Sequence, residues 1–203
     1  MLKTLFPNMQ AALLQEIEAY GIEKKVDRQT EILREGQYVK YIPLVIEGLV
    51  KVFTRHEEKE LLLYYIRPQE SCIMSFAALL KDEPSRIFAI CEEPTTLLLL
   101  PQVQVISWSK RFPELNFLFF EQYSMRYGDL LHTINQVIFD KMDKRLYDYL
   151  KEKVSLTQKN PIKMAHKDIA NDLGTAREVV SRVMKKLENE GKVRQRGSEI
   201  EVL

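Results

Sequence analysis

Three side chains near the C-terminus have the types and spacing to read the edges of DNA bases. Arg177, Glu178 and Arg182 stand at the start of a run with helical periodicity. A guanidinium group can donate two hydrogen bonds to O6 and N7 of guanine, and a carboxylate can accept one from N4 of cytosine. The same spacing also fits a solvated helix face on which Glu178 pairs with Arg182. We interpret the three residues as base-reading side chains.

The stretch His166–Leu187 predicts the two helices that must position these side chains. The small Ala170 lets the helices cross closely, and Gly174 permits a sharp turn between them. Helical hairpins in other proteins share this spacing, so the outward-facing charged residues decide the interpretation as a helix-turn-helix. The inner faces are formed by apolar residues at helical spacing: Ile169, Leu173, Val180, Val183 and Leu187.

Basic residues surround this unit. Residues 154–203 hold 10 basic and 7 acidic residues, a net charge of +3, whereas residues 1–153 hold 20 and 22, a net charge of −2. Residues 191–202 alternate around a glycine-containing turn, which predicts a β-hairpin. Such a hairpin after a recognition helix is placed to contact DNA phosphates as a wing. We expect phosphate contacts from five residues of the helix and hairpin: Thr175, Lys185, Lys186, Arg194 and Arg196.

Residues 31–100 predict a small antiparallel β-barrel or roll. Short β-runs alternate there with turn-like segments, and the apolar spacing of residues 8–20 predicts a helix packed on the roll. The β-runs are Leu44–Ile46, Leu49–Phe53, Leu61–Ile66, Ile87–Cys91 and Thr95–Leu100.

A long helix is predicted after Pro113, ending near Asp140. Its apolar residues are separated by 3, 4, 3, 4 and 3 positions, the spacing of a seam between two helices, so we expect a dimer helix. The alternative is packing on the chain's own roll, because a core helix has similar periodicity. A second apolar edge, with Phe119, Leu131 and Ile138, allows both. The seam residues are Phe120, Tyr123, Tyr127, Leu130, Ile134 and Val137.

These elements predict an α+β fold with three parts. Residues 1–111 form an effector-like β-roll domain, residues 112–139 a dimerisation helix, and residues 140–203 a winged helix-turn-helix DNA-binding domain. The third part begins with a predicted helix over residues 140–153. A loop is predicted over residues 155–161, since Pro161 biases Asn160 towards extended geometry.

Composition and motifs exclude several classes. The chain has 203 residues, 45% of them hydrophobic, which is ordinary for a folded protein, and no apolar run approaches the roughly 20 residues of a membrane helix. Without a signal-like start we expect a cytoplasmic protein with no membrane contact. Two cysteines and no clustered Cys/His spacing predict no metal site and no cofactor. The sequence contains no phosphate-binding loop, no nucleophile elbow and no HExxH motif. We therefore expect that the protein is not an enzyme and has no catalytic residues.

The chain resembles bacterial transcription regulators of the Crp/Fnr type over nearly its whole length. The segment 175–182, TAREVVSR, looks like the family's recognition helix, and residues 31–53 are similar to its first roll strands. The resemblance implies a cyclic-nucleotide-binding-like roll, a homodimer, a pseudo-palindromic double-stranded DNA operator, and RNA polymerase as a further partner. Since Arg177, Glu178 and Arg182 match the family's readers, it also implies a half-site resembling TGTGA.

The departures from the family concern the effector. Members that bind cyclic AMP carry a Gly-Glu pair followed about ten residues later by Arg. Those positions here hold Ile73, Met74 and Ser85, so we expect no response to cyclic AMP in the ordinary mode; Arg86, one residue further, faces the other side of a strand. Ala165 stands where the family often has a capping Thr, and its loss weakens the helix N-terminus or a phosphate contact.

Two other possibilities remain open. Cys72 could sense oxidants as a thiol, although free cysteines are usually buried and unreactive. The chain could also be a ligand-binding or thiol-sensing regulatory module that acts through protein contacts.

Overall fold

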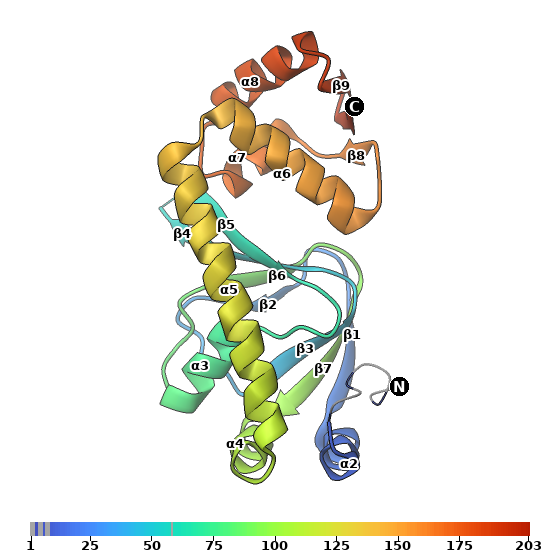
Figure 1. Cartoon of the computed structure of the whole chain (residues 1–203), viewed down its shortest axis with the longest axis vertical. Coiled ribbons are helices and arrows are strands. Elements are labelled where there is room, and N and C mark those ends of the chain that lie inside the picture. The colour runs from blue at the N-terminus through green and yellow to red at the C-terminus, as the bar shows by residue number, and fades with distance from the viewer. Residues whose placement is uncertain (1–2, 4–5, 7–8, 58) are drawn as a thin grey trace. The chain divides into compact units, whose positions relative to one another are not determined.

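The computed structural model describes residues 3, 6, 9–57 and 59–203, and the side chains of all of these except residues 59, 138 and 139. The chain divides into two compact units (Figure 1). The first comprises Met1–Thr54 with Leu63–Leu130, and the second comprises Arg55–Leu62 with Leu131–Leu203.

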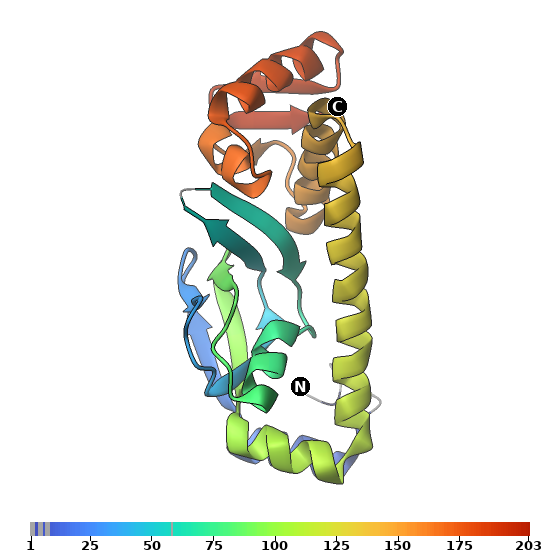
Figure 2. The same ribbon diagram turned by 90° about the vertical axis from the view of Figure 1, so that its left-hand side faces the viewer.

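Two antiparallel sheets form the predicted β-roll, and both are visible in Figure 2. One has the strand order β1-β7-β3, and the other has the order β2-β6-β4-β5. Alternating apolar residues from both sheets fill a common core, which is the expected result for sheets with one face buried. The strands are β1 (Ile22–Val26), β2 (Glu31–Leu33), β3 (Tyr41–Glu47), β4 (Val50–His56), β5 (Lys59–Ile66), β6 (Phe88–Cys91) and β7 (Thr95–Pro101).

Helices close this core. The predicted N-terminal helix is α2 (Ala11–Tyr20), with Leu13, Leu14 and Ile17 buried; Asn8, its predicted first residue, lies outside the described residues. Two helices were missing from the sequence prediction: α3 (Ile73–Lys81) and α4 (Gln102–Arg111). Both are about ten residues long and lie next to strongly apolar runs, where period 3.6 and period 2 are hard to separate.

The long helix α5 (Pro113–Phe139) begins at the predicted proline and runs through the predicted segment. Its successor α6 (Met142–Thr157) extends further than expected, so the prediction of a loop from Ser155 was wrong over three residues. Pro161 restricts only the residue before it, and Val154 packs on the core of the second unit, which continues the apolar period of the helix.

The C-terminal elements form a winged helix-turn-helix. Helices α7 (His166–Asp172) and α8 (Arg177–Asn189) follow the short strand β8 (Ile162–Lys163), and the predicted hairpin is β9 (Val193–Arg196) with β10 (Glu199–Val202). The three strands form one antiparallel sheet in the order β8-β10-β9.

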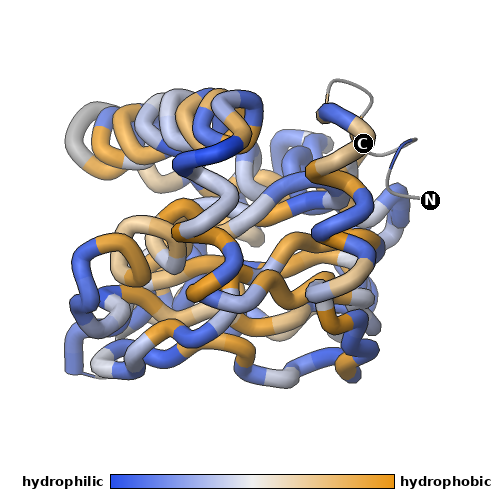
Figure 3. Tube along the Cα trace, turned by 90° about the horizontal axis from the view of Figure 1, so that it is seen from below, coloured by the Kyte–Doolittle hydropathy of each residue, from blue (hydrophilic) through white to orange (hydrophobic). Residues whose placement is uncertain are grey.

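Hydrophobic and hydrophilic residues are interleaved along the trace (Figure 3). Accordingly, within the described residues no helix combines the length and the apolar character that crossing a membrane requires.

Candidate DNA-binding site

The helix-turn-helix is built on its own apolar core. Ile169 and Ala170 of α7 and Val180 of α8 are buried as the sequence predicts, together with Leu146 and Leu150 of α6. At the turn, Gly174 has φ +63, a left-handed conformation that favours glycine. The core therefore fixes the angle at which α8 is presented.

The three predicted base-reading side chains stand on the outer face of α8. Arg177 and Glu178 are its first two residues, and Arg182 lies one turn later; all three are exposed. Within the part of the chain that the structure describes, none of them forms an ion pair or a side-chain hydrogen bond, so the expected alternative of a Glu178–Arg182 pair is not formed. Their charged groups are available to a ligand.

The predicted phosphate-contacting residues fall into two groups. Lys185 and Arg196 are exposed and, among the described residues, make no ion pair, and Thr175 is half-buried just before α8. Lys186 and Arg194 are instead paired inside the domain. Arg194 Nη1 donates to Glu201 Oε2 at 2.8 Å across the hairpin.

Lys186 is held at the end of α8 that lies away from the base-reading side chains. Its ammonium group donates to Asp143 of α6 and lies 3.7 Å from Glu190 Oε1. The hydrogen bond to Asp143 raises the pKa of Lys186 and lowers that of Asp143. Of the five expected phosphate contacts, Lys186 and Arg194 thus have charges that are already offset, Lys186 by two carboxylates and Arg194 by one.

The helix-turn-helix lacks side-chain caps. Ala165 occupies the N-cap of α7 and Ala176 that of α8, both in extended conformation and without a side-chain hydrogen bond to the helix. Ala165 thus stands at the N-cap, the position at which a Thr would cap the helix.

Sequence reasoning missed two polar contacts that fix this domain. Arg145 of α6 donates from Nη2 to the carbonyl of Leu173 at 2.8 Å, at the C-terminal end of α7. His166, the first residue of α7, contacts Ser181 of α8 and Gln195 of β9. Arg145 lies in the predicted helix over residues 140–153 and His166 in the stretch His166–Leu187, but neither periodicity nor spacing reveals partners 15 to 29 residues away.

Helix α5 carries two distinct faces. Leu115 and Phe119 are buried in the core of the roll, and Phe119 stacks on Phe76 with ring centroids 3.8 Å apart. The predicted seam residues face away from this core: Leu130 is half-buried, while the exposed fractions of the others are Phe120 70%, Tyr123 54%, Tyr127 58%, Ile134 51% and Val137 45%. Among the described residues the seam is therefore uncovered. The expected second edge is confirmed only at Phe119, because Leu131 is 44% exposed and the side chain of Ile138 lies outside the described residues.

In the roll, the positions of the family's phosphate-binding residues are apolar or self-satisfied. Ile73 is buried, and Met74 packs on the same core. The buried Ser85 donates from Oγ to the carbonyl of Ile87 at 3.0 Å and accepts from the Ile87 N–H. Arg86 points into solvent and pairs with Glu83.

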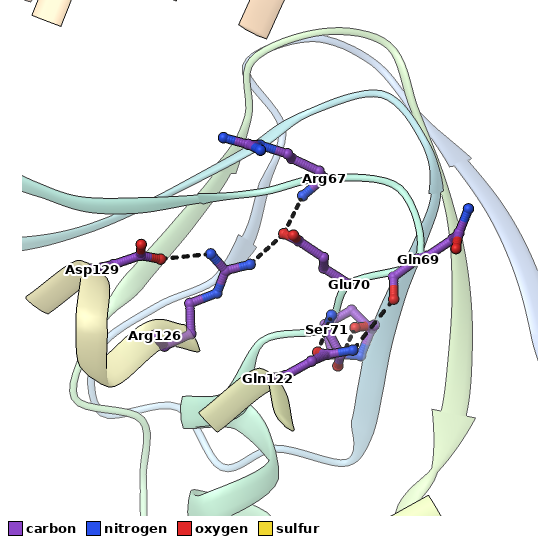
Figure 4. Close-up of polar contacts among 8 residues, drawn as sticks. Arg67, Gln69, Glu70, Ser71, Gln122, Arg126 and Asp129 are labelled. Carbon is purple, nitrogen blue, oxygen red and sulfur yellow. Dashed lines mark hydrogen bonds and ion pairs between the residues drawn. The ribbon is translucent and has the colours of Figure 1, made fainter. Parts of the chain in front are cut away.

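A polar cluster links the loop between β5 and α3 to helix α5 (Figure 4). Arg126 of α5 is buried, donates to Glu70 of the loop, and donates to Asp129 at 2.8 Å. Its guanidinium carbon lies 4.7 Å from the centre of the Tyr64 ring. Burial raises the pKa of Tyr64 well above its usual range.

Gln122 makes the second link. Its Oε1 accepts from the N–H of Ser71 at 2.7 Å, and its Nε2 donates to the carbonyl of Gln69 at 3.3 Å (Figure 4). Helix α5 is therefore joined to the loop by the ion pair of Arg126 with Glu70 and by the hydrogen bonds of the Gln122 side chain with the loop backbone.

Sequence comparisons assign both parts of the chain. Residues 23–111 match the cyclic nucleotide-binding domain, and residues 144–203 match the Crp-like helix-turn-helix domain. Among characterised relatives, the CRP-like protein Clp of Xanthomonas axonopodis pv. citri is 21% identical over 204 residues, covering 95% of this chain and 88% of Clp.

Solved structures share the fold. A putative transcriptional regulator of the Crp/Fnr family from Eubacterium rectale aligns with a TM-score of 0.87 at 24% identity, over 98% of this chain and 93% of that one. The c-di-GMP-responsive global regulator CLP of Xanthomonas campestris aligns with a TM-score of 0.83 at 18% identity, over 95% and 99%. With a cyclic nucleotide-binding domain followed by a Crp-like helix-turn-helix on this shared fold, the chain belongs to the Crp/Fnr family of transcription regulators.

Proposed function

We propose that this regulator binds a pseudo-palindromic operator as a homodimer and reads each half-site with Arg177, Glu178 and Arg182. The observation that carries the proposal is the state of these side chains: all three are exposed on the N-terminal half of α8 without ion pairs among the described residues. A helix N-terminus placed in the major groove presents such side chains to base edges. A half-site resembling TGTGA fits two arginines and one carboxylate.

Backbone contacts position the helix on the duplex. Lys185 and Arg196 make no ion pair with the described residues, Thr175 lies beside the helix start, and Arg194 stands on the wing, paired with Glu201. Lys186 would have to exchange Asp143 for a phosphate, so we assign it the smallest share of the five.

The exposed stripe on α5 supports the homodimer. An uncovered row of aromatic and aliphatic side chains at alternating spacings of 3 and 4 residues suits a second copy of the same helix, since a two-fold axis brings identical stripes together. Dimer symmetry then sets the two recognition helices about one DNA turn apart.

We further propose that cyclic AMP in the family's ordinary mode is not the effector. Ile73 and Met74 offer neither the backbone access nor the carboxylate of the family's Gly-Glu pair, and the Ser85 hydroxyl is occupied by Ile87. The link that a ligand would make between roll and dimer helix is made here by Arg126 and Gln122. We place the protein in the cytoplasm, with RNA polymerase as a partner.

The alternative of a module acting through protein contacts, by ligand or thiol sensing, has less support. Cys72 and Cys91 are both fully buried, and burial raises the pKa of the Cys91 thiol, so an oxidant would meet neither an accessible nor an ionised sulfur at Cys91.

Selection of bound sequences from random duplex DNA, with purified protein and no added ligand, tests the proposal. The expected result is enrichment of a two-fold-related site with half-sites one helical turn apart, followed by a steep fall in affinity between two salt concentrations. Affinity for that site should not change when cyclic AMP or cyclic di-GMP is added. If no sequence is enriched with or without these nucleotides, the alternative function is favoured.

A further inference from the structure

The imidazole of His166 contacts the recognition helix and the wing at the same time. The residue is half-buried at the start of α7. Its Nδ1 lies 2.9 Å from Ser181 Oγ in the middle of α8, and its Nε2 lies 2.9 Å from Gln195 Nε2 on β9. Both ring nitrogens thus contact side chains of the same domain. His166 is not among the predicted DNA contacts.

Gln195 extends the contact into the wing turn. Its side-chain Nε2 also donates to the carbonyl of Gly197 at 2.9 Å, and its backbone N–H donates to Glu188 Oε1 of α8 at 3.1 Å. Gln195 stands between Arg194 and Arg196, and side chains alternate along a strand. Fixing the inward Gln195 side chain therefore fixes the strand that presents both arginines on the other face.

His166 Nε2 lies close to both polar atoms of the Gln195 amide, 2.9 Å from Nε2 and 3.2 Å from Oε1. A neutral ring with its proton on Nδ1 donates to Ser181 Oγ and accepts at Nε2 from the Gln195 amide, which also donates to the Gly197 carbonyl. A ring with its proton on Nε2 donates to Gln195 Oε1 and accepts at Nδ1 from the Ser181 hydroxyl, so either tautomer contacts both neighbours. The two nitrogens thus have separate tasks: Nδ1 holds the recognition helix, and Nε2 holds the wing.

We propose that His166 is the positioning residue that sets the wing against the recognition helix, so that Arg194 and Arg196 reach the DNA backbone while α8 lies in the groove. The proposal rests on the proposed function for its effect on DNA, but the Ser181–His166–Gln195–Gly197 network is a property of the free protein.

The two tasks can be separated by substitution. An Asn amide can replace Nδ1 and a Gln amide can replace Nε2, so His166→Asn keeps the contact to Ser181, whereas His166→Gln keeps the contact to Gln195. The expected result is that His166→Ala and His166→Asn weaken operator binding about tenfold, the value of one or two hydrogen bonds, whereas His166→Gln stays within about threefold of the wild type. His56→Ala, an exposed histidine outside the network, is the matched control and should have no effect.

Coupling to the wing distinguishes positioning from a direct contact. In an Arg194→Ala/Arg196→Ala background, His166→Ala should cost little further affinity, because the wing it positions no longer contacts DNA. Independent, multiplying losses would overturn the proposal.

Hydrogen exchange of the wing amides, measured without DNA, keeps the test independent of the proposed function. We expect faster exchange over β9 and β10 in His166→Ala and His166→Asn, but not in His166→Gln, with α6 unchanged and the melting temperature showing that each variant is folded. Unchanged wing exchange in folded His166→Ala would overturn the network. If the wild type selects no DNA sequence, the proposed function fails, while the exchange result still decides the role of His166.

Discussion

At the scale of single residues, we assign DNA binding to exposed charged side chains without ion pairs, and a structural role to buried charged side chains with several partners. Arg182 is exposed and unpaired among the described residues, whereas Arg126 is buried with two carboxylates and an aromatic ring. The two arginines should respond to substitution in opposite ways, the first through DNA specificity and the second through folding.

Arg182→Ala should relax base preference at one operator position. Losing a bidentate contact to guanine costs about 1 to 3 kcal/mol, and the loss should vanish on operators altered at that base pair. Lys185→Ala is the control, because a phosphate contact is lost equally on every sequence. Titrations on the selected operator, its single-base variants and random DNA measure both; equal loss on all of them would contradict base reading by Arg182.

Arg126→Met should destabilise the roll. Arg126 is buried and Glu70 is largely shielded from water, so removing Arg126 leaves the Glu70 carboxylate uncompensated, which costs about 3 kcal/mol; Asp129 is more exposed and adds little. Arg86→Met breaks the exposed pair with Glu83 and should change the free energy of unfolding by less than about 1 kcal/mol. Urea unfolding of both variants gives the two changes in the free energy of unfolding. Equal changes would show that the buried cluster around Arg126 stabilises the roll no more than an exposed ion pair does.

The buried thiols should be protected. Cys72 and Cys91 are fully buried, so a thiol reagent should label them at the rate of unfolding or local opening in native protein and at once in denaturant. Rapid labelling of Cys72 in the native state would revive the thiol-sensing alternative.

At the scale of elements, the sequence predicts the helices and strands that have a clear hydrophobic period. It misses short helices and contacts between residues far apart in the chain. The five predicted β-runs, the long helix, the helix-turn-helix and the wing carry clear periods or turn signals, and all are present. Strand β1 (Ile22–Val26) precedes the predicted roll and was missed. Helices α3 and α4 are short, and in α3 nearly every residue is apolar, so its period does not stand out from a strand. The contact of His166 with Ser181 and that of Arg126 with Glu70 join residues 15 and 56 positions apart, which no pattern along the chain encodes.

Ala165→Thr should stabilise the helix-turn-helix. The N-cap of α7 has the extended conformation that a capping Thr adopts, but its side chain offers no acceptor, so a hydroxyl should add about 1 kcal/mol. Thermal unfolding measures the gain, with Ala165→Val as the control that adds bulk without a hydroxyl. A gain from both variants would mean that packing, not capping, is responsible.

At the scale of the whole molecule, the exposed apolar stripe of α5 is a surface that we expect a second copy of the chain to cover. Five of its six seam residues are exposed aromatic or aliphatic side chains, a large apolar surface for one element. A partner helix would remove this surface from water and supply the two-fold symmetry that the operator is expected to share.

Tyr127→Asp should therefore produce a monomer. The substitution occurs twice in a two-fold interface, so two buried charges should raise the dimer dissociation constant at least about 100-fold. Sedimentation velocity over a range of concentrations measures this, with Glu121→Gln, an exposed α5 residue outside the seam, as the control. If the wild type itself sediments as a monomer at high concentration, the dimer proposal is wrong.

The amide of Gln122 supplies partners for two backbone groups at the turn between β5 and α3. By accepting from the N–H of Ser71 and donating to the carbonyl of Gln69, it offers the loop the hydrogen-bond pattern that a residue of a parallel strand would offer. The other side of the loop is already paired with β3, through Val45 and the Gln69 N–H and Glu70 carbonyl. Because Ser71 is fully buried, its N–H would lack both water and an acceptor without this amide, so Gln122 removes the cost of an unsatisfied buried donor.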